Sequence, residues 1–430
     1  MRRRFTAAAV HSGGGAGVRR RFTAVAALVA VGASLVLGAG TATADPVRDQ
    51  EYWLDDYGIR AAWNTTQGAG VTIAVIDTGV DGSVPELAGV VIGGADFSGL
   101  GSSDGQTPVG SEGSEHGTMV AAWAAGRGTG GENGVIGSAP AASILAISVG
   151  FGEGTSTTDD QIAEAVRFAV DQGADVINMS LTRNTLDWPQ SWDGAFLYAM
   201  ENDVVVVAAA GNRGSGTTVV GAPATMPGVL TVAGVGVSGE ASFDASTQGI
   251  TISVAAPSED LVGVIPGGGH VRRSGTSGAA PIVAGIVALV RAAHPELDAA
   301  NVINRVVATA RDSGSQGYDP IYGYGLVDAQ AAVTAPVDAV TANPMGSLAE
   351  WITVNRRAEA TAVPIPPGTP APTPAPVVAG PANPLGSILP TVNLLRNIGI
   401  PLGVIVLFLA TLTALAVLAI RRFRAPRQTE

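Results

Sequence analysis

Short apolar runs recur through the middle of the chain and alternate with segments of helical periodicity. Glycine or polar turn residues bound these runs, as expected for strands that are buried on both faces. The runs are residues 71–76, 144–149, 176–179, 204–208, 229–235 and 252–255. Between them, residues 159–172 place Ile162, Val166 and Ala169 on one face of a helix. This alternation predicts an α/β fold of three layers, with a mainly parallel sheet between helices.

Small residues lead into a longer apolar segment, residues 277–293, which contains one early proline, Pro281. The pattern predicts a buried helix whose first turn begins at Ser277. A helix start presents unpaired N–H groups and the positive end of the dipole, which suits a serine oxygen that attacks beside a developing oxyanion. Serine is a weak nucleophile. It needs a base, usually histidine, and an acid that orients the base.

One of the four histidines lies where a catalytic base is expected. His116 opens a helical stretch, whereas His11 lies in a basic leader and His270 in a glycine-rich loop. His294 is at the end of a helical segment, where a cation simply suits the dipole. His116 is therefore the candidate base.

Asp77 ends the first apolar run, at the carboxyl end of a buried strand, where open parallel sheets bind their ligands. An Asp-Thr-Gly at this position also commonly caps a turn. With Asp312, in Asp-Ser-Gly, it permits a dyad of two carboxylates as well. We disfavour the dyad because Asp312 follows a helical pattern over residues 300–311, whereas a dyad of this kind needs two equivalent loops in an all-β chain.

The three candidates occur in the motifs I-D-T-G-V, E-H-G-T-M and S-G-T-S-G-A-A-P. In these motifs, and in the chain order Asp77, His116, Ser277, the sequence resembles the subtilisin-like serine proteases over residues 51–335. The resemblance implies a subtilisin-like fold and hydrolysis of peptide bonds by an Asp-His-Ser triad. It also implies that the side-chain amide of Asn212 stabilises the oxyanion together with the N–H of the nucleophile. The plain alternative for Asn212 is a turn residue.

The same resemblance suggests where an extended polypeptide substrate binds. Ser180 and Leu181, in I-N-M-S-L, resemble the strand edge that pairs with a peptide. Ala209, Ala210 and Gly211 resemble one wall of the primary specificity pocket.

The chain departs from the family pattern beside these motifs. Glu115, after Ser114, stands where an Asp-Gly pair is usual, a change expected to affect local packing more than proton transfer. Thr182 replaces a common glycine, and Gly278 replaces a bulkier residue after the nucleophile, so the preferred substrate residue stays open. Residues 131–137 resemble a loop that binds calcium in some subtilisins, but oxygen ligands are sparse there. We therefore predict no required metal or cofactor, with structural calcium as the alternative.

Composition divides the 430 residues into three parts. Residues 1–44 contain no acidic residue, residues 45–395 contain 35 acidic residues against 13 arginines, and residues 396–430 are apolar and then basic. The net charge of −22 in the middle part disfavours a nucleic-acid partner. The chain has no cysteine, which excludes a thiol nucleophile and disulfide bonds.

The first part, residues 1–44, has the basic, apolar and small-residue order of a secretory signal peptide, with cleavage expected after Ala44. Its R-R-x-F pattern also permits the twin-arginine route, and Val18 is an alternative first residue. Residues 45–335 are then expected to form the protease domain, with a short N-terminal extension in place of a long propeptide.

Beyond this domain the sequence predicts a membrane anchor. Residues 336–397 form a Pro-rich linker, and residues 398–420 are 23 residues without a charge, enough to cross a bilayer. The arginines of residues 421–430 indicate a cytoplasmic tail and a protease domain on the outer side of the cell membrane. A buried helix is the alternative for the apolar run.

This architecture resembles the mycosins, the membrane-bound proteases of type VII secretion systems in actinobacteria, although typical mycosins carry disulfides. The resemblance implies substrates among the proteins secreted by that system and contacts with its membrane complex. Two alternatives are a general surface-tethered protease for maturation or degradation and a scaffold that kept the fold without activity. The intact set of Asp77, His116, Asn212 and Ser277 disfavours the scaffold.

Overall fold

The computed structural model describes residues 47–130 and 133–356. The predicted signal peptide, most of the predicted linker, the predicted membrane helix and the basic tail lie outside these residues.

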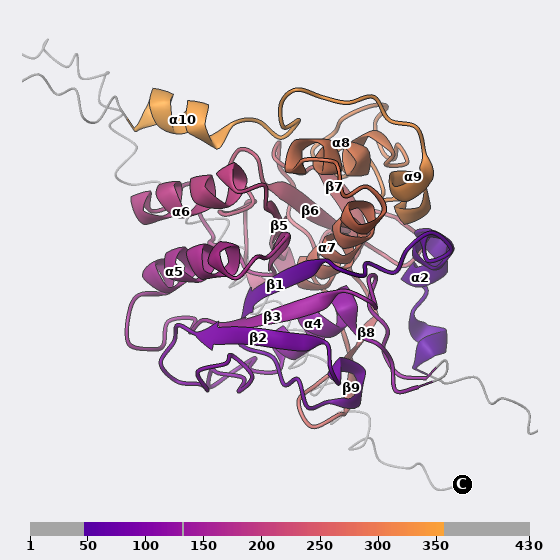
Figure 1. Cartoon of the computed structure of the whole chain (residues 1–430). Helices are drawn as coiled ribbons and strands as arrows, with labels where there is room; N and C mark the ends of the chain where they lie inside the picture. The colour runs from indigo at the N-terminus through magenta and orange to yellow at the C-terminus, as the bar shows by residue number, and fades with distance from the viewer. Residues whose placement is uncertain (1–46, 131–132, 357–430) are drawn as a thin grey trace, which may run out of the picture. The chain divides into compact units, whose positions relative to one another are not determined.

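A parallel sheet forms the centre of the described chain (Figure 1). Its seven strands have the spatial order β2-β3-β1-β4-β5-β6-β7, and every neighbouring pair is parallel. The strands are β1 (Thr72–Asp77), β2 (Val91–Asp96), β3 (Ser143–Ser148), β4 (Val176–Met179), β5 (Val205–Ala209), β6 (Leu230–Val235) and β7 (Val254–Pro257). Six of them match the predicted apolar runs, and β4 to β7 are buried at every position, as strands covered on both faces should be.

Strand β1 lies where the winding of the sheet changes direction. The chain leaves β1 to form β2 and β3 on one side, and then returns to form β4 to β7 on the other. Loops at the carboxyl ends of the strands diverge at such a switch point and leave a crevice between them. Asp77 is the last residue of β1, so the fold places its side chain at this crevice.

Helices cover both faces of the sheet (Figure 1). On one face α4 (His116–Ala125) packs against α7 (Thr276–Ala293), and on the other α5 (Thr158–Asp171) packs against α6 (Gln190–Glu201). This is the predicted three-layer arrangement. The remaining helical segments of the described chain are η1 (Arg48–Gln50), α2 (Trp53–Asp56), α3 (Ile59–Ala62), η2 (Pro85–Leu87), η3 (Arg213–Ser215), α8 (Ala299–Ala308), α9 (Ala329–Thr334) and α10 (Leu348–Asn355).

Helix α7 is the core helix of the fold. It packs against α4, α8, α9 and strands β4 to β7, and all of its residues from Gly278 to Val290 are buried. Within residues 47–130 and 133–356 it is the helix long and apolar enough to cross a membrane, yet most of that apolar surface is inside the protein. Its hydropathy therefore reflects burial in the core. The helix begins at Thr276, one residue before the predicted start.

Three strands were not apparent from the sequence. β2 contains two glycines and is only partly buried, and β8 (Leu261–Val264) with β9 (His270–Arg273) forms a short antiparallel hairpin. The packed chain also continues past residue 335, the end predicted for the protease domain. Leu348 at the start of α10 is buried, and Arg356 binds Asp193 of α6 through a 2.8 Å Nε–Oδ2 contact.

Candidate active site

The carboxylate of Asp77 and the imidazole of His116 form a close pair. His116 Nδ1 lies 2.8 Å from Oδ1 and 3.0 Å from Oδ2 of Asp77. The carboxylate side chain is only 1% exposed, whereas 31% of the imidazole side chain is exposed. Because Nδ1 faces the carboxylate, Nε2 is the nitrogen left to exchange a proton with a reacting group.

Thr78 fixes both members of this pair. Its N–H donates to Asp77 Oδ1 at 2.7 Å. Its hydroxyl oxygen accepts from the N–H of Gly117, at the start of α4, and donates to the carbonyl of Ser114. The residue that follows the acid in D-T-G thus holds the first turn of the helix that carries the base. The sequence analysis gave Thr78 no role, although its place beside the acid was a usable signal.

The surroundings of His116 raise its pKa above the ordinary value. Burial acts in the opposite direction, but the negative charge of Asp77, its hydrogen bond and the negative charge of Glu115 together outweigh burial. Glu115 therefore contributes to the proton affinity of His116, after the larger contributions of Asp77. Its carboxylate also pairs with Arg273, with Nη2 and Oε1 3.2 Å apart.

Ser277 lies in the first turn of α7, as its motif predicts. Its hydroxyl donates to the carbonyl of Ser180 at 3.4 Å, and within the described chain it has no hydrogen bond to His116. The serine and histidine side chains nevertheless line one cavity. Bonds between a nucleophile and its base are often long in unliganded enzymes and shorten when substrate binds.

The amide of Asn212 has a fixed orientation. Its Oδ1 accepts from the N–H and from the hydroxyl of Thr276, each at 2.8 Å. A backbone N–H can only donate, so the oxygen must face Thr276 and the NH₂ group must face away. That NH₂ group has no hydrogen-bond partner among the described residues, and Asn212 lines the same cavity as Ser277. It is thus a free donor beside the candidate nucleophile, and Thr276, which orients it, is a second residue that the sequence argument missed.

The predicted substrate-binding residues follow two neighbouring strands. Ser180 and Leu181 come directly after β4, and Ala210 and Gly211 come directly after Ala209, the last residue of β5. Both segments are tied to the start of α7. Ser180 Oγ donates to the carbonyl of Ser277 at 2.8 Å, and the N–H of Gly211 donates to Thr276 Oγ1 at 3.0 Å.

Neighbouring side chains leave little space around Gly211. A β-carbon at this position would lie 2.7 Å from Thr217 Cγ2 and 3.2 Å from Thr182 Cγ2. Gly211 also has a φ of +103°, which a residue with a side chain rarely adopts. Two threonine methyl groups therefore narrow this side of the site.

Comparison with known families gives this geometry its context. The model of the subtilase family of peptidases, S8, matches residues 68–325, which contain every residue of the site described above. The chain belongs to the subtilase family. It is therefore a subtilisin-like serine protease, and the mainly parallel sheet with flanking helices is the subtilisin-like fold.

Individual relatives show which subtilases the chain resembles. The subtilase is 38% identical over 268 residues to subtilisin E of Bacillus subtilis, an alignment that covers 62% of this chain and 66% of that protein. Among solved structures it is similar to MycP1 from the ESX-1 type VII secretion system, with 31% identity and a TM-score of 0.59 over 68% of this chain and 88% of that one. It is also similar to the MycP3 protease of the ESX-3 system, with 32% identity and a TM-score of 0.57 over 69% and 90% of the two chains. The subtilase is thus mycosin-like, as the sequence predicts.

The loop that resembles a calcium site is held in another way in this subtilase. In its described part, the carbonyls of Asn133 and Gly134 accept from the guanidinium of Arg48, and the N–H of Ile136 donates to Glu51. Across residues 47–130 and 133–356 there is no group of three or more His, Cys, Asp or Glu residues arranged to hold a metal ion.

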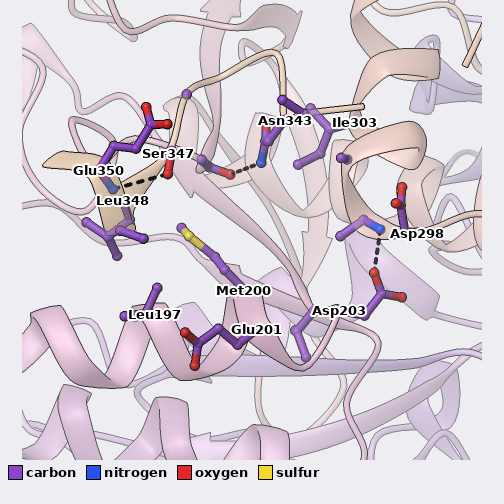
Figure 2. A pocket seen from close by; sticks show the side chains of 17 residues that line it. Leu197, Met200, Glu201, Asp203, Asp298, Ile303, Asn343, Ser347, Leu348 and Glu350 are labelled. Carbon is purple, nitrogen blue, oxygen red and sulfur yellow. Dashed lines mark hydrogen bonds between the residues drawn. The ribbon is translucent and has the colours of Figure 1, made fainter. Parts of the chain in front are cut away.

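A larger cavity of about 480 Å³ lies apart from the site, between α6, α8 and residues 342–350 (Figure 2). Four carboxylates surround it, from Glu201, Asp203, Asp298 and Glu350. Two of these already have structural roles. Asp203 accepts from the N–H of Ala299, and Asp298 caps α8. The cavity lining contains neither a histidine nor a nucleophile paired with a base, so it offers no basis for peptide hydrolysis.

Proposed function

We propose that this protein is a membrane-anchored, extracytoplasmic serine endopeptidase that works with a type VII secretion system. In the proposed mechanism Ser277 attacks the peptide carbonyl while His116 takes its proton. His116 then gives that proton to the leaving amine, and Asp77 orients the imidazole and stabilises its charged form. Water releases the acyl group from Ser277 in a second round of the same proton transfers.

The observation that carries the proposal is the convergence of three features on one cavity. The imidazole is bound to a buried carboxylate through Nδ1, the candidate nucleophile is at a helix start, and a free amide donor lies beside it. The NH₂ of Asn212 and the N–H of Ser277 are suited to bind the negative charge that develops on the carbonyl oxygen. A structural ion pair would need neither the serine nor the amide.

Residues 180–181 and 209–211, which are both hydrogen-bonded to the start of α7, support an extended polypeptide as substrate. Ser180 and Leu181 offer main-chain groups to a peptide that pairs as an additional strand. Residues 209–211 would form one wall of the pocket that binds the side chain just before the cleaved bond. Because Thr182 and Thr217 narrow the space over Gly211, we expect a small side chain just before the cleaved bond.

The anchor and the partners rest on sequence and on similarity. The uncharged residues 398–420 and the arginines that follow them support a single membrane span with the protease domain outside the cell membrane. The likeness to MycP1 and MycP3 supports a place beside a type VII membrane complex. Fractionation of cells tests the anchor: the full chain should sediment with membranes, and a chain that stops at residue 397 should be released. Sedimentation of both would contradict the anchor.

A covalent probe tests the enzyme without knowledge of its substrate. Full-length protein in membranes is treated with a fluorophosphonate that reacts with activated serines. We expect labelling of the wild type and none of Ser277→Ala, because labelling requires a serine whose proton a base can accept. His270→Ala, which alters a histidine that does not line the cavity of Ser277, is the matched control and should be labelled. Labelling of Ser277→Ala would contradict the assignment of the nucleophile.

A further inference from the structure

The edge segment, residues 180–182, carries main-chain groups without partners. Within the described chain, neither the N–H nor the C=O group of Leu181 or of Thr182 forms a hydrogen bond. A peptide that pairs as an additional strand needs such a run of free donors and acceptors. The run has only two residues, so its shape depends strongly on how its ends are held.

Arg183 holds the end that follows Thr182. Its N–H donates to the carbonyl of Ala222 at 2.8 Å, and its carbonyl accepts from Thr182 Oγ1 at 3.0 Å. The N–H of Ala222 donates in turn to the carbonyl of Thr185 at 3.0 Å. The backbone is therefore paired again from the first residue after the free run.

The side chain of Arg183 connects this point to two helices. Nη1 binds Asp159 Oδ1 in the first turn of α5, and the guanidinium carbon lies 5.7 Å from the centroid of the Trp192 ring in α6. Trp192 is fully buried, and its Nε1 donates to the carbonyl of Asp159 at 2.9 Å. The two partners of Arg183 are thus fixed to each other before they meet the guanidinium.

Stacking on Trp192 matters here because the ion pair alone is weak. The side chains of Arg183 and Asp159 are 34% and 35% exposed, and pairs with this exposure hold a segment only loosely. A planar guanidinium over an indole adds attraction that a lysine would not reproduce equally well. The anchor therefore depends on an arginine at this position.

The anchor does not reach the reacting groups directly. Thr182 points toward the proposed substrate site, since its methyl group lies 3.2 Å from the place of a β-carbon on Gly211. Arg183, the next residue, contacts α5 and α6 and does not line the cavity of Ser277. Any influence of Arg183 on catalysis must then pass through the edge segment.

We propose that Arg183 is a positioning residue for the substrate, which holds the free main-chain groups of Leu181 and Thr182 ready to pair with a peptide. The inference rests on the proposed function. A segment that is ordered before binding does not lose that freedom when the peptide arrives, and this favours affinity. Thr182 stands where glycine is common in the family, and it too has less freedom to lose than glycine.

Two covalent probes of different length test this role. The short probe is the N-acetylated diphenyl phosphonate analogue of alanine, and the long probe carries three more alanines before it, which can pair with the edge segment. In both, Ser277 Oγ forms a bond to phosphorus, His116 takes the hydroxyl proton, and a phenol leaves with that proton. The measured quantity is the second-order rate constant of inactivation of full-length protein in membranes.

We expect the wild type to react about 100-fold faster with the long probe, because remote contacts lower the barrier at the reacting centre. Arg183→Met should slow the long probe about 10-fold and the short probe less than about threefold. Arg183→Lys should give an intermediate rate with the long probe. Asp159→Asn should slow the long probe as well, and less so when Arg183 is already replaced, because the two residues act as one unit.

Arg167→Met is the matched control. Arg167 also connects α5 to α6, with its guanidinium carbon 5.8 Å from the centroid of the Tyr198 ring. This variant should keep the wild-type ratio of the two rate constants. The thermal midpoint of each variant shows whether the fold is retained.

The outcomes separate the two proposals. Equal rates of the two probes with the wild type, an unchanged ratio in Arg183→Met, or an equal slowing of both probes would overturn the role of Arg183 while the enzyme stands. A wild type that reacts with neither probe, or a Ser277→Ala variant that reacts with either, would overturn the proposed mechanism and the role of Arg183 with it.

Discussion

Two carboxylate–histidine pairs in this protein are almost identical as pairs. In one, His116 Nδ1 lies 2.8 Å from Asp77 Oδ1, and in the other, His270 Nε2 lies 2.7 Å from Glu86 Oε1. Both carboxylates are 1% exposed, and the imidazoles are 31% and 28% exposed. Distance and burial alone therefore do not distinguish the pair proposed to be catalytic from the second pair.

The difference lies in what surrounds each imidazole. Around His116 there are a serine at a helix start, a free amide donor and a cavity. The second pair connects η2, which carries Glu86, to β9, which begins at His270, and Glu86 Oε2 is buried with no hydrogen-bond partner among the described residues. The pairs also use different ring nitrogens. In the proposed mechanism the chemistry depends on Ser277 and Asn212 as well as on the first pair, so the second pair provides an internal control for the first.

The largest expected effect comes from removing the charge of Asp77, the carboxylate proposed to orient His116. Asp77→Asn should lower kcat by roughly 10⁴, because an amide favours the wrong tautomer of His116 and does not stabilise its charged form. Turnover of a small activated ester by the wild type and the variant measures this loss of kcat. Removing the other carboxylate, in Glu86→Gln, should change kcat by less than about threefold. Comparable losses in both variants would erase the distinction between the pairs.

The next effect concerns the oxyanion donor, which the second pair lacks. Asn212→Ala should lower kcat by about 10²–10³, with little change in KM, because the donor acts on charge that develops in the transition state. Steady-state kinetics give the two constants separately. Since Asn212 also accepts two bonds from Thr276, the thermal midpoint should be measured alongside. A rise in KM at constant kcat would instead assign Asn212 to ground-state binding.

The free energy of unfolding should depend on the second pair, Glu86 and His270. His270→Ala leaves the carboxylate of Glu86 buried without its partner, so we expect a loss of about 1–3 kcal/mol in the free energy of unfolding. Adding Glu86→Leu to this variant should restore part of the loss, because the unpaired charge is then replaced by an apolar group. Denaturant titration of all three proteins measures this. If the double variant is less stable than His270→Ala, the pair is not what holds η2 to β9.

The smallest effect is on the pH profile. The base must be neutral to accept a proton, so activity falls as the pH drops through the raised pKa of His116. Glu115 contributes to that raised pKa, and Glu115→Gln should therefore shift the acid limb of kcat/KM to lower pH. Asp187→Asn removes a carboxylate elsewhere on the surface and should leave the limb in place. A shift to higher pH in Glu115→Gln would show that the sign assigned to Glu115 is wrong.

The sequence predicted those parts of the fold in which burial alone dictates the residues. Strands β4 to β7 are apolar because both of their faces are covered, and α7 is apolar because it is enclosed. It did not reveal β2, whose Gly93 and Gly94 weaken the strand pattern, or α10, which has one fully buried side chain, Leu348.

The sequence proposed the members of the candidate site, and the structure brings Asp77, His116, Asn212 and Ser277 together, but the details of their contacts were less accessible. Asp77, His116 and Ser277 stand in short motifs whose order along the chain is informative. The orientation of Asn212 depends on Thr276, which is 64 residues away, and the pairing of Glu86 with His270 spans 184 residues. Nothing in local composition encodes such contacts. The cavity beside Ser277 is likewise lined by Leu261 and Trp123, which come from separate elements.

The enclosure of α7 limits which parts of the candidate site can move. The helix is surrounded by strands β4 to β7 and three other helices, so Ser277 cannot be withdrawn by a local fluctuation without opening the core. The segment before His116 is different, because residues 110–113 are exposed and contain glycine at both ends. A rearrangement of the candidate site would therefore be easier at the segment before His116 than at the start of α7, where Ser277 is held by the packing of the core.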